Sequence, residues 1–218
     1  MNTETNLHPT RGAWQMLAMA VLLGGCAGLA PKPLPDPNLH VLAPGPVTRT
    51  APGTRNLVLE VSVPRASPGF DTPRMAYVRR AYELDYFADS RWADTPARML
   101  GPLLTQALER SGGFGTVVQA PTVVAADVRV NAELIRLQQD FTTRPSRAEV
   151  ALRVQLVDVR ARRVVATKLF EATENASSED AYGGVAAANA ALERVLVQVV
   201  DFCFAETADR PAPAGPAR

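Results

Sequence analysis

Residues able to carry out catalysis or to hold a metal ion are scarce in this chain of 218 residues. It has two histidines, His8 and His40, and two cysteines, Cys26 and Cys203. A serine hydrolase needs a histidine base, and a zinc site needs several His, Cys or acidic ligands gathered at one point. The Gly-x-Ser-x-Gly motif that exposes a nucleophilic serine does not occur in the sequence. The sequence therefore disfavours an enzyme, and we expect no catalytic residue, no bound cofactor and no metal site.

The charge balance argues against nucleic acid as a partner. The formal net charge is +1, and aromatic residues make up 6% of the chain. Binding to nucleic acid depends largely on neutralising phosphates with clustered basic residues. With 47% apolar and 21% charged residues, the composition is that of an ordinary globular domain.

The first 26 residues have the layout of a secretory signal. A polar stretch that includes Arg11 precedes an apolar run from Trp14 to Leu23, and two glycines lead into Cys26. The apolar run is about ten residues long, whereas a helix that crosses the hydrocarbon core of a membrane needs about 20. We therefore predict a cleaved signal peptide over residues 1–25.

Residues 23–26, Leu-Gly-Gly-Cys, resemble the lipobox of bacterial lipoproteins. In that motif one enzyme attaches diacylglycerol to the thiol, and a second cleaves just before it. The resemblance implies a covalent lipid with acyl chains such as palmitate on Cys26, and Cys203 would then have no disulfide partner in the chain. It also implies delivery to the outer membrane, because Ala27 stands where aspartate favours inner-membrane retention. The alternative is an incidental thiol after an ordinary signal peptide.

Proline usage divides the rest of the chain. Seven prolines fall between Pro31 and Pro52, and three more between Pro211 and Pro216. Proline-rich segments favour an extended polyproline geometry of about 3.1 Å per residue. We predict a tether from the lipidated cysteine over residues 26–54, a folded domain over 55–206 and a disordered tail over 207–218. Such a tether would hold the domain several nanometres from the bilayer.

Hydrophobic periodicity predicts strands on either side of a helix. Alternating apolar residues indicate a strand over 57–63, and shorter strands around 75–78 and 82–87 flank a hairpin turn at Arg79 and Arg80. The second half of the chain predicts an antiparallel meander with a turn at 158–162 and a polar loop over 138–146. Its strands are expected over residues 128–134, 150–156 and 163–170.

Two segments have the apolar spacing of amphipathic helices. The first begins at Thr95 and Pro96, a residue pair that suits a helix N-terminus, and ends at Gly112. The second begins near Asp180 and carries an apolar stripe that includes Cys203, which we predict to be a buried residue and not a reactive thiol. The predicted fold class is α+β, with a mostly antiparallel sheet and both amphipathic helices packed on one face.

Other candidate sites have structural interpretations. Gly112 to Gly115 follow a helix, so they favour a cap and turn over a phosphate-binding loop. The Gly183-Gly184 pair opens the last helix, but Glu179 and Asp180 beside it would repel an anion. Glu83 and Asp85 would share a strand face, where a solvated surface explains them better than acid and base catalysis.

A few polar and aromatic residues are harder to assign. The segment over 86–92 places Tyr86, Arg91 and Trp92 just ahead of the first helix, and these residue types suit either a partner interface or the edge of the core. Asn189 stands among alanines in the last helix, where a buried amide would need partners and would fix how helix and sheet meet.

Taken in order, these segments resemble the periplasmic ABC-type transport auxiliary lipoproteins. The resemblance covers most of residues 55–206 and rests on Cys26, residues 84–96, the strand-rich centre and residues 186–192. It implies a non-enzymatic accessory of a transport system whose MCE-domain proteins carry lipid between the two membranes. The expected partners are an MCE-domain protein and the outer membrane, with a homo-oligomer as a further candidate. A carrier that itself holds an acyl chain in an apolar cavity is the alternative, and an envelope hydrolase has the weakest support.

Overall fold

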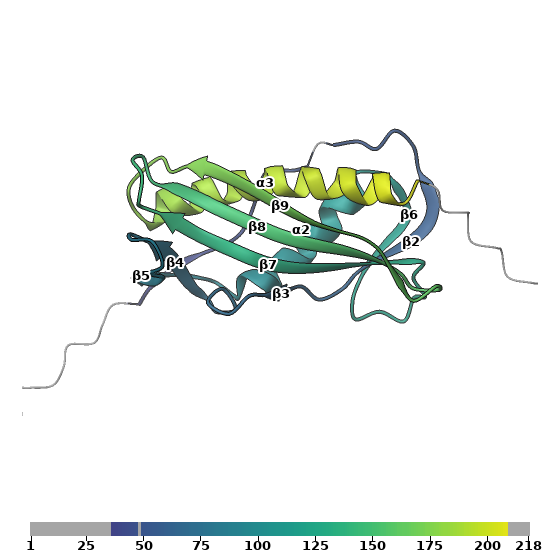
Figure 1. The fold of residues 1–218 in the computed structure, drawn as a ribbon, viewed down its shortest axis with the longest axis horizontal. Coiled ribbons are helices and arrows are strands. Elements are labelled where there is room, and N and C mark those ends of the chain that lie inside the picture. The colour runs from purple at the N-terminus through teal and green to yellow at the C-terminus, as the bar shows by residue number, and fades with distance from the viewer. Residues whose placement is uncertain (1–35, 48, 209–218) are drawn as a thin grey trace, which may run out of the picture. The chain divides into compact units, whose positions relative to one another are not determined.

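One long strand, β7, connects most of the sheet. The computed structural model describes residues 36–47 and 49–208. Within them nine strands form a mixed sheet accompanied by two helices (Figure 1). In chain order the elements are β1 (Asn38–His40), β2 (Arg55–Val61), β3 (Arg65–Ala66), β4 (Arg74–Val78), β5 (Asp85–Trp92), α2 (Pro96–Arg110), β6 (Phe114–Gln119), β7 (Val128–Asp140), β8 (Arg147–Asp158), β9 (Arg163–Asn175) and α3 (Ala181–Glu206).

Both edges of β7 are paired. Along one edge β8 runs antiparallel to it for its whole length, and β9 pairs antiparallel with β8 in turn. Along the other edge β2, β3 and β4 follow one another, each parallel to β7. The remaining pairings add β6 parallel to β2, β5 antiparallel to β4, and β1 parallel to β5. The long pairings are the predicted antiparallel meander, and the fold class is α+β as predicted.

A register shift in β7 redirects its side chains. Up to Leu134 the even-numbered residues of the strand are buried, as the alternation predicts. The pairing with β8 shifts between Leu134 and Arg136, and beyond it Leu137 and Gln139 are buried instead. A bulge of this kind adds one residue to a strand and so reverses the faces of the residues that follow. It places a polar side chain, Gln139, in the interior.

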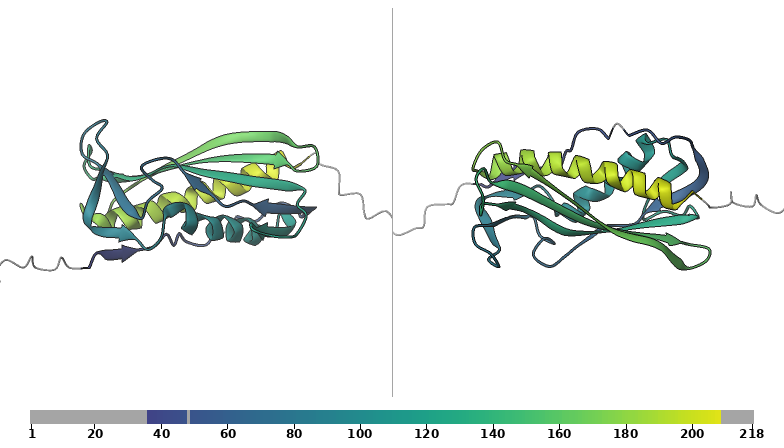
Figure 2. Two further views of the ribbon diagram at one scale, coloured as in Figure 1. Left: turned by 90° about the horizontal axis from the view of Figure 1, so that it is seen from below. Right: turned by 45° about the horizontal axis from the view of Figure 1, so that its top comes forward.

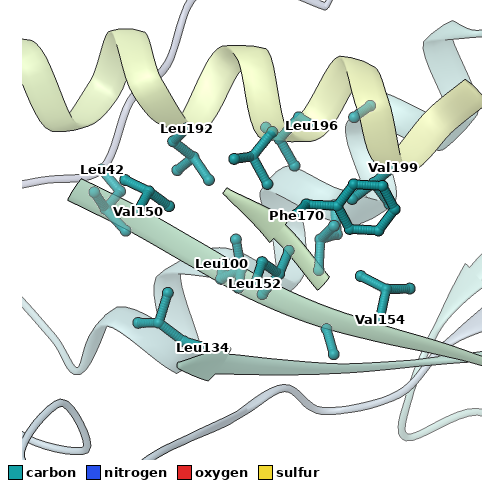
Figure 3. Packing of buried hydrophobic residues seen from close by; sticks show 14 of the residues in the cluster. Leu42, Leu100, Leu134, Val150, Leu152, Val154, Phe170, Leu192, Leu196 and Val199 are labelled. Carbon is teal, nitrogen blue, oxygen red and sulfur yellow. The ribbon is translucent and has the colours of Figure 1, made fainter. Parts of the chain in front are cut away.

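Helix α3 packs along the long strands. Its first turn is capped by Asp180, whose Oδ1 accepts a hydrogen bond of 2.8 Å from the backbone N–H of Gly183. The predicted apolar stripe faces β8 and β9, and Figure 2 shows the helix lying along these strands. Figure 3 shows the packing of Leu192, Leu196 and Val199 from α3 against Val150, Leu152, Val154 and Phe170 from the sheet.

Helix α2 begins and ends where the sequence predicts. Thr95 precedes the helix in extended conformation, Pro96 is its first residue, and Gly112 follows it with a φ of +64°. That φ lies in the left-handed region, which glycine adopts without a steric penalty. The helix contacts β6, β3, β2 and β7, and it also contacts α3. The placement of both helices on a single face of the sheet stays a prediction.

Several predicted strand boundaries were wrong. Residues Phe114–Gln119 form β6 and not a turn, and the third strand runs over Asp85–Trp92 and not over 82–87. Tyr82, the predicted start of that strand, lies in the hairpin turn with a φ of +70°. Strands β7 and β8 extend to Asp140 and from Arg147, which shortens the predicted polar loop. These boundaries depend on pairing partners distant in sequence, which local periodicity does not contain.

The chain on either side of the predicted domain also packs on it. The part of the predicted tether that the structure describes contains β1, and Leu42 and Val47 lie in the hydrophobic core. The free energy gained by burying these two apolar side chains outweighs the tendency of the prolines between them to keep the segment extended. At the other boundary Thr207 is buried, and its hydroxyl donates to the carbonyl of Cys203 at 2.8 Å. The remaining residues of the predicted tail, 209–218, lie outside the described residues.

The central position of β8 predicts that two leucines on neighbouring strands differ strongly in their contribution to the free energy of unfolding. Leu152 is completely buried on β8, whereas Leu169 on the neighbouring strand is 45% exposed. Leu152→Ala leaves a cavity and should lower the free energy of unfolding by about 2–5 kcal/mol, measured by chemical denaturation. The control, Leu169→Ala, should change it by less than about 1 kcal/mol. Similar losses in both variants would show that β8 is not the centre of the core.

Candidate functional site

The predicted lipid-attachment residue, Cys26, lies outside the described residues, together with the predicted signal peptide over 1–25. The described chain begins at Asp36, ten residues after Cys26. The structure therefore bears on this site through the segment that leads away from it into the domain.

That segment is fastened to the domain by pairing, burial and one side-chain amide. Strand β1 runs parallel to β5 with Asn38 opposite Ser90. Three residues beyond β1, the backbone N–H of Ala43 donates to Oδ1 of Asn189 at 2.7 Å, and the Asn189 amide donates to the carbonyl of Val41 at 3.4 Å. Asn189 is structural, as predicted, but it holds the entering chain against α3 and does not join helix to sheet.

This arrangement shortens the part of the predicted tether that lies between Cys26 and the folded domain. Within the predicted tether of residues 26–54, Asn38–His40 form a strand of the sheet, and Leu42 and Val47 pack in the core. The ten residues from Cys26 to Asp36 reach at most about 35 Å when fully extended. A lipid on Cys26 would therefore keep the domain close to the bilayer.

The predicted interface residues divide between surface and core. Trp92 is 4% exposed and packs in the hydrophobic core, while Arg91, its neighbour on β5, is exposed because successive strand residues point to opposite faces. Tyr86 is half-buried: its hydroxyl donates to the carbonyl of Gly69 at 3.0 Å, and the Arg74 guanidinium lies 3.8 Å from the centre of its ring. Trp92 therefore cannot form part of a partner interface, whereas Arg91 and the exposed part of Tyr86 can contact a partner.

A polar hollow that the sequence analysis missed lies over β2, β7 and β8. Its volume is about 510 Å³, and acidic and basic side chains pair across its strands. Arg129 donates to both carboxylate oxygens of Glu60 at 3.0 and 3.2 Å, and Arg153 lies 2.7 Å from Glu133. Alternate charged residues on neighbouring strands were the available signal. The hollow offers paired charges and amides, which suit polar docking and contain no activated nucleophile.

The glycine pair at the start of α3 is explained by close packing. A Cβ at Gly184 would lie 2.1 Å from Oε1 of Gln139, and one at Gly183 would lie 2.3 Å from the carbonyl oxygen of Ser178. A side chain at position 183 would overlap backbone atoms, and one at position 184 would require the buried Gln139 amide to move. No anion-binding role is needed to account for them.

The remaining chemistry-bearing residues are dispersed. Glu83 lies in the β4–β5 turn at 3.8 Å from Arg80, and Asp85 begins β5, so the two acids do not share a strand face. Within the described ranges no three His, Cys, Asp or Glu residues gather closely enough to hold a metal ion. Cys203 is completely buried, as predicted, and burial raises the pKa of its thiol to about 12. At neutral pH it is therefore a protonated thiol in the core.

The helices of the described chain were also tested as membrane spans. Neither α2 nor α3 combines the length and the apolar character needed to cross a bilayer.

The folded domain belongs to a known family. A family model described as "ABC-type transport auxiliary lipoprotein component" matches residues 40–200. The match begins in β1 and ends in α3, so it covers nearly all of the described domain. The chain is thus a member of the ABC-type transport auxiliary lipoproteins, and the predicted resemblance is confirmed.

Solved structures support the same fold. Protein XCC0632 from Xanthomonas campestris is 23% identical, with a TM-score of 0.68 over 78% of this chain and 96% of that chain. A second crystal structure, of an uncharacterized protein, is 11% identical, with a TM-score of 0.59 over 80% of this chain and all of the other. At such identities the likeness extends to the fold alone. No curated protein matches the chain.

Because Trp92 is buried and Arg91 is exposed, substitutions at these two neighbouring residues should change the stability by very different amounts. Trp92→Ala removes a buried ring and should lower the free energy of unfolding by about 3–5 kcal/mol, measured by denaturation. Arg91→Ala removes an exposed side chain and should change it by no more than about 0.5 kcal/mol. A stable Trp92→Ala variant that loses partner binding would instead return this residue to an interface.

The contact of Asn189 with the entering chain predicts a local loosening. Asn189→Ala removes the acceptor of the Ala43 N–H and should cost about 1 kcal/mol. The Ala43 amide should then exchange its hydrogen faster, measured by NMR. Gln198→Ala, at an exposed position of the same helix, is the control and should leave that exchange unchanged. Equal exchange of the Ala43 amide hydrogen in the unsubstituted protein and in both variants would show that Asn189 does not hold this segment.

Proposed function

We propose that the protein is a lipoprotein anchored to the periplasmic face of the outer membrane and a non-catalytic accessory of an MCE/ABC-type intermembrane lipid transport system. In this role it docks or receives the periplasmic assembly of MCE-domain proteins. The observation that carries the proposal is the family match over residues 40–200, which spans the described domain. The lipobox-like residues 23–26 supply the anchor, and Ala27 supports delivery to the outer membrane.

Docking is favoured over enzyme chemistry because the described residues form polar and aromatic surfaces, and no group of catalytic side chains is assembled among them. The arginine-carboxylate pairs of the polar hollow and the exposed Arg91 are available to a partner. In the described part of the chain the one cysteine thiol is buried, and the two acidic residues of the polar hollow, Glu60 and Glu133, are paired with arginines. Recognition by a protein partner uses such polar pairs together with aromatic and arginine side chains.

The alternative function, a carrier that holds an acyl chain itself, requires an apolar cavity between sheet and helices. The apolar hollow beneath the start of α3, lined by residues that include Trp92, Leu137 and Ala188, has a volume of about 10 Å³. That is about the space needed by one water molecule. At the centre of the interface Val154, Ala191 and Val195 have no exposed surface. This close packing supports docking over lipid carriage.

The anchor predicts a change in fractionation. Each buried methylene of an acyl chain contributes about 0.8 kcal/mol, and two or three chains hold a protein on a membrane permanently. Cys26→Ser should leave the domain folded but release it into the soluble periplasmic fraction, measured by cell fractionation and circular dichroism. The control, Cys203→Ala, removes the other cysteine and should leave the protein in the membrane fraction.

A second variant separates the two membranes. Ala27→Asp should move the lipidated protein from the outer to the inner membrane, measured on a sucrose gradient. Outer-membrane fractionation of Cys26→Ser in cells that lack the MCE partner would contradict the anchor. An unchanged position of Ala27→Asp would contradict the assignment to the outer membrane.

A further inference from the structure

Several turns meet at one end of the domain. Strand β4 runs parallel to β7 with Val78 opposite Asp140, so the turns that follow them, residues 79–84 and 141–146, lie at the same end. The start of α3 joins them, because the Glu179 carboxylate accepts a hydrogen bond of 2.8 Å from the Ser146 backbone N–H. Figure 1 shows β4 and β5 beside this end of β7. We call residues 77–87, 141–146 and 179–182 the aromatic end.

The aromatic end contains every tyrosine of the chain. Four tyrosines occur in the sequence, at positions 77, 82, 86 and 182. Tyr82 is fully exposed at 106% of its reference area, and Tyr182 is 71% exposed. The backbone of Tyr82 has a φ of +70°, a conformation that is unfavourable for a bulky residue and that the core does not demand, since the side chain contacts solvent. Large rings are thus presented to the outside at this end.

Arginines accompany the rings. The Arg79 guanidinium lies 5.0 Å from the centre of the Tyr77 ring and 5.7 Å from that of Phe141. A hollow of about 540 Å³ is lined by Arg79 and Phe141 together with Arg144 and Glu179. Glu179 is already engaged by the Ser146 N–H, and within the described residues neither Arg79 nor Arg144 forms an ion pair. The hollow therefore holds two guanidinium groups against one carboxylate, and the excess of positive charge suits an anion such as a phosphate.

The entering chain arrives at the same end. Strand β1 is parallel to β5, and a second hollow, of about 750 Å³, is lined by Leu39 of β1 together with Asp180 and Tyr182 at the start of α3. Leu39 is 65% exposed. Because Cys26 is ten residues before Asp36, an anchored domain has this end within about 35 Å of the bilayer surface.

We propose that the aromatic end lies against the phospholipid headgroups of the membrane that holds the lipid anchor. This inference rests on the proposed function, because it takes the anchor on Cys26 as its starting point. Tyrosine is enriched at membrane interfaces, where its ring lies among the headgroups and its hydroxyl meets water. Arg79 and Arg144 bind lipid phosphates, and Tyr82, Tyr182 and Leu39 enter the interface. The contact orients the domain so that its polar hollow, which lies over the first half of β7, faces a periplasmic partner.

The test uses the full lipidated protein in vesicles of phosphatidylethanolamine and phosphatidylglycerol. Tyr82→Trp places a fluorescent reporter at the aromatic end. The matched control is Val123→Trp, at a residue 104% exposed in the loop before β7 and so at the opposite end of that strand. Vesicles whose phospholipids carry bromine atoms near the headgroups should quench Tyr82→Trp and shift its emission to the blue. Val123→Trp should keep the emission of a residue in water, and the signal of native Trp92 is subtracted from both.

Two outcomes overturn the inference. One is water-like, unquenched emission from both variants in protein that floats with the vesicles. The other is emission of Tyr82→Trp that shifts only when an MCE-domain protein is added, which would assign this end to a protein partner. Flotation of the same samples tests the anchor separately, because protein that fails to float contradicts the proposed function. The double variant Arg79→Ala with Arg144→Ala, still lipidated, should float equally but lose quenching in the Tyr82→Trp background.

Discussion

Pairing along both edges of β7 is the constraint on which the other elements depend. One edge is occupied by β8 alone, which supplies a long antiparallel ladder, and the other is divided among β2, β3 and β4. Because of this division, three strands that precede β7 in the sequence each pair with a different part of it. It also explains why the buried Glu60 is tolerated, since the Arg129 side chain from the adjacent strand donates to both of its carboxylate oxygens.

The same pairing determines where the ends of the chain leave the core. Because β4 joins β7 at its last residues, the β4–β5 hairpin stands at the end where β7 turns into β8, and β1 follows on the edge of β5. The segment from the predicted lipid site therefore enters the sheet and then crosses to α3, where Asn189 holds it. Strand β1, the β4–β5 hairpin and the start of α3 are brought to one end by strand pairing and by the hydrogen bond from the Ser146 N–H to Glu179, although they are far apart in the sequence.

The proposed docking function depends on the surfaces of the domain. The interface between α3 and the long strands is filled by side chains, and its hollow is of the size of one water molecule. The surface carries a polar hollow with paired charges over one part of the sheet and exposed tyrosines with unpaired arginines at one end. The proposed function requires both a surface for the membrane and a surface for a partner, and these two regions are separate.

The sequence by itself determined the strongly periodic elements, the family and the scarcity of residues able to catalyse a reaction or hold a metal ion. The helices at Pro96 and Ala181 and the three strands of the meander follow from caps and alternation, because those signals are local. Tertiary structure decided the rest. Strand β6, the extent of β5 and the burial of Trp92 depend on neighbours that only folding supplies. Proline content predicted a free tether, but pairing of β1 with β5 and burial of Leu42 outweighed it, because backbone hydrogen bonds and apolar contacts form with residues 50 to 150 positions away.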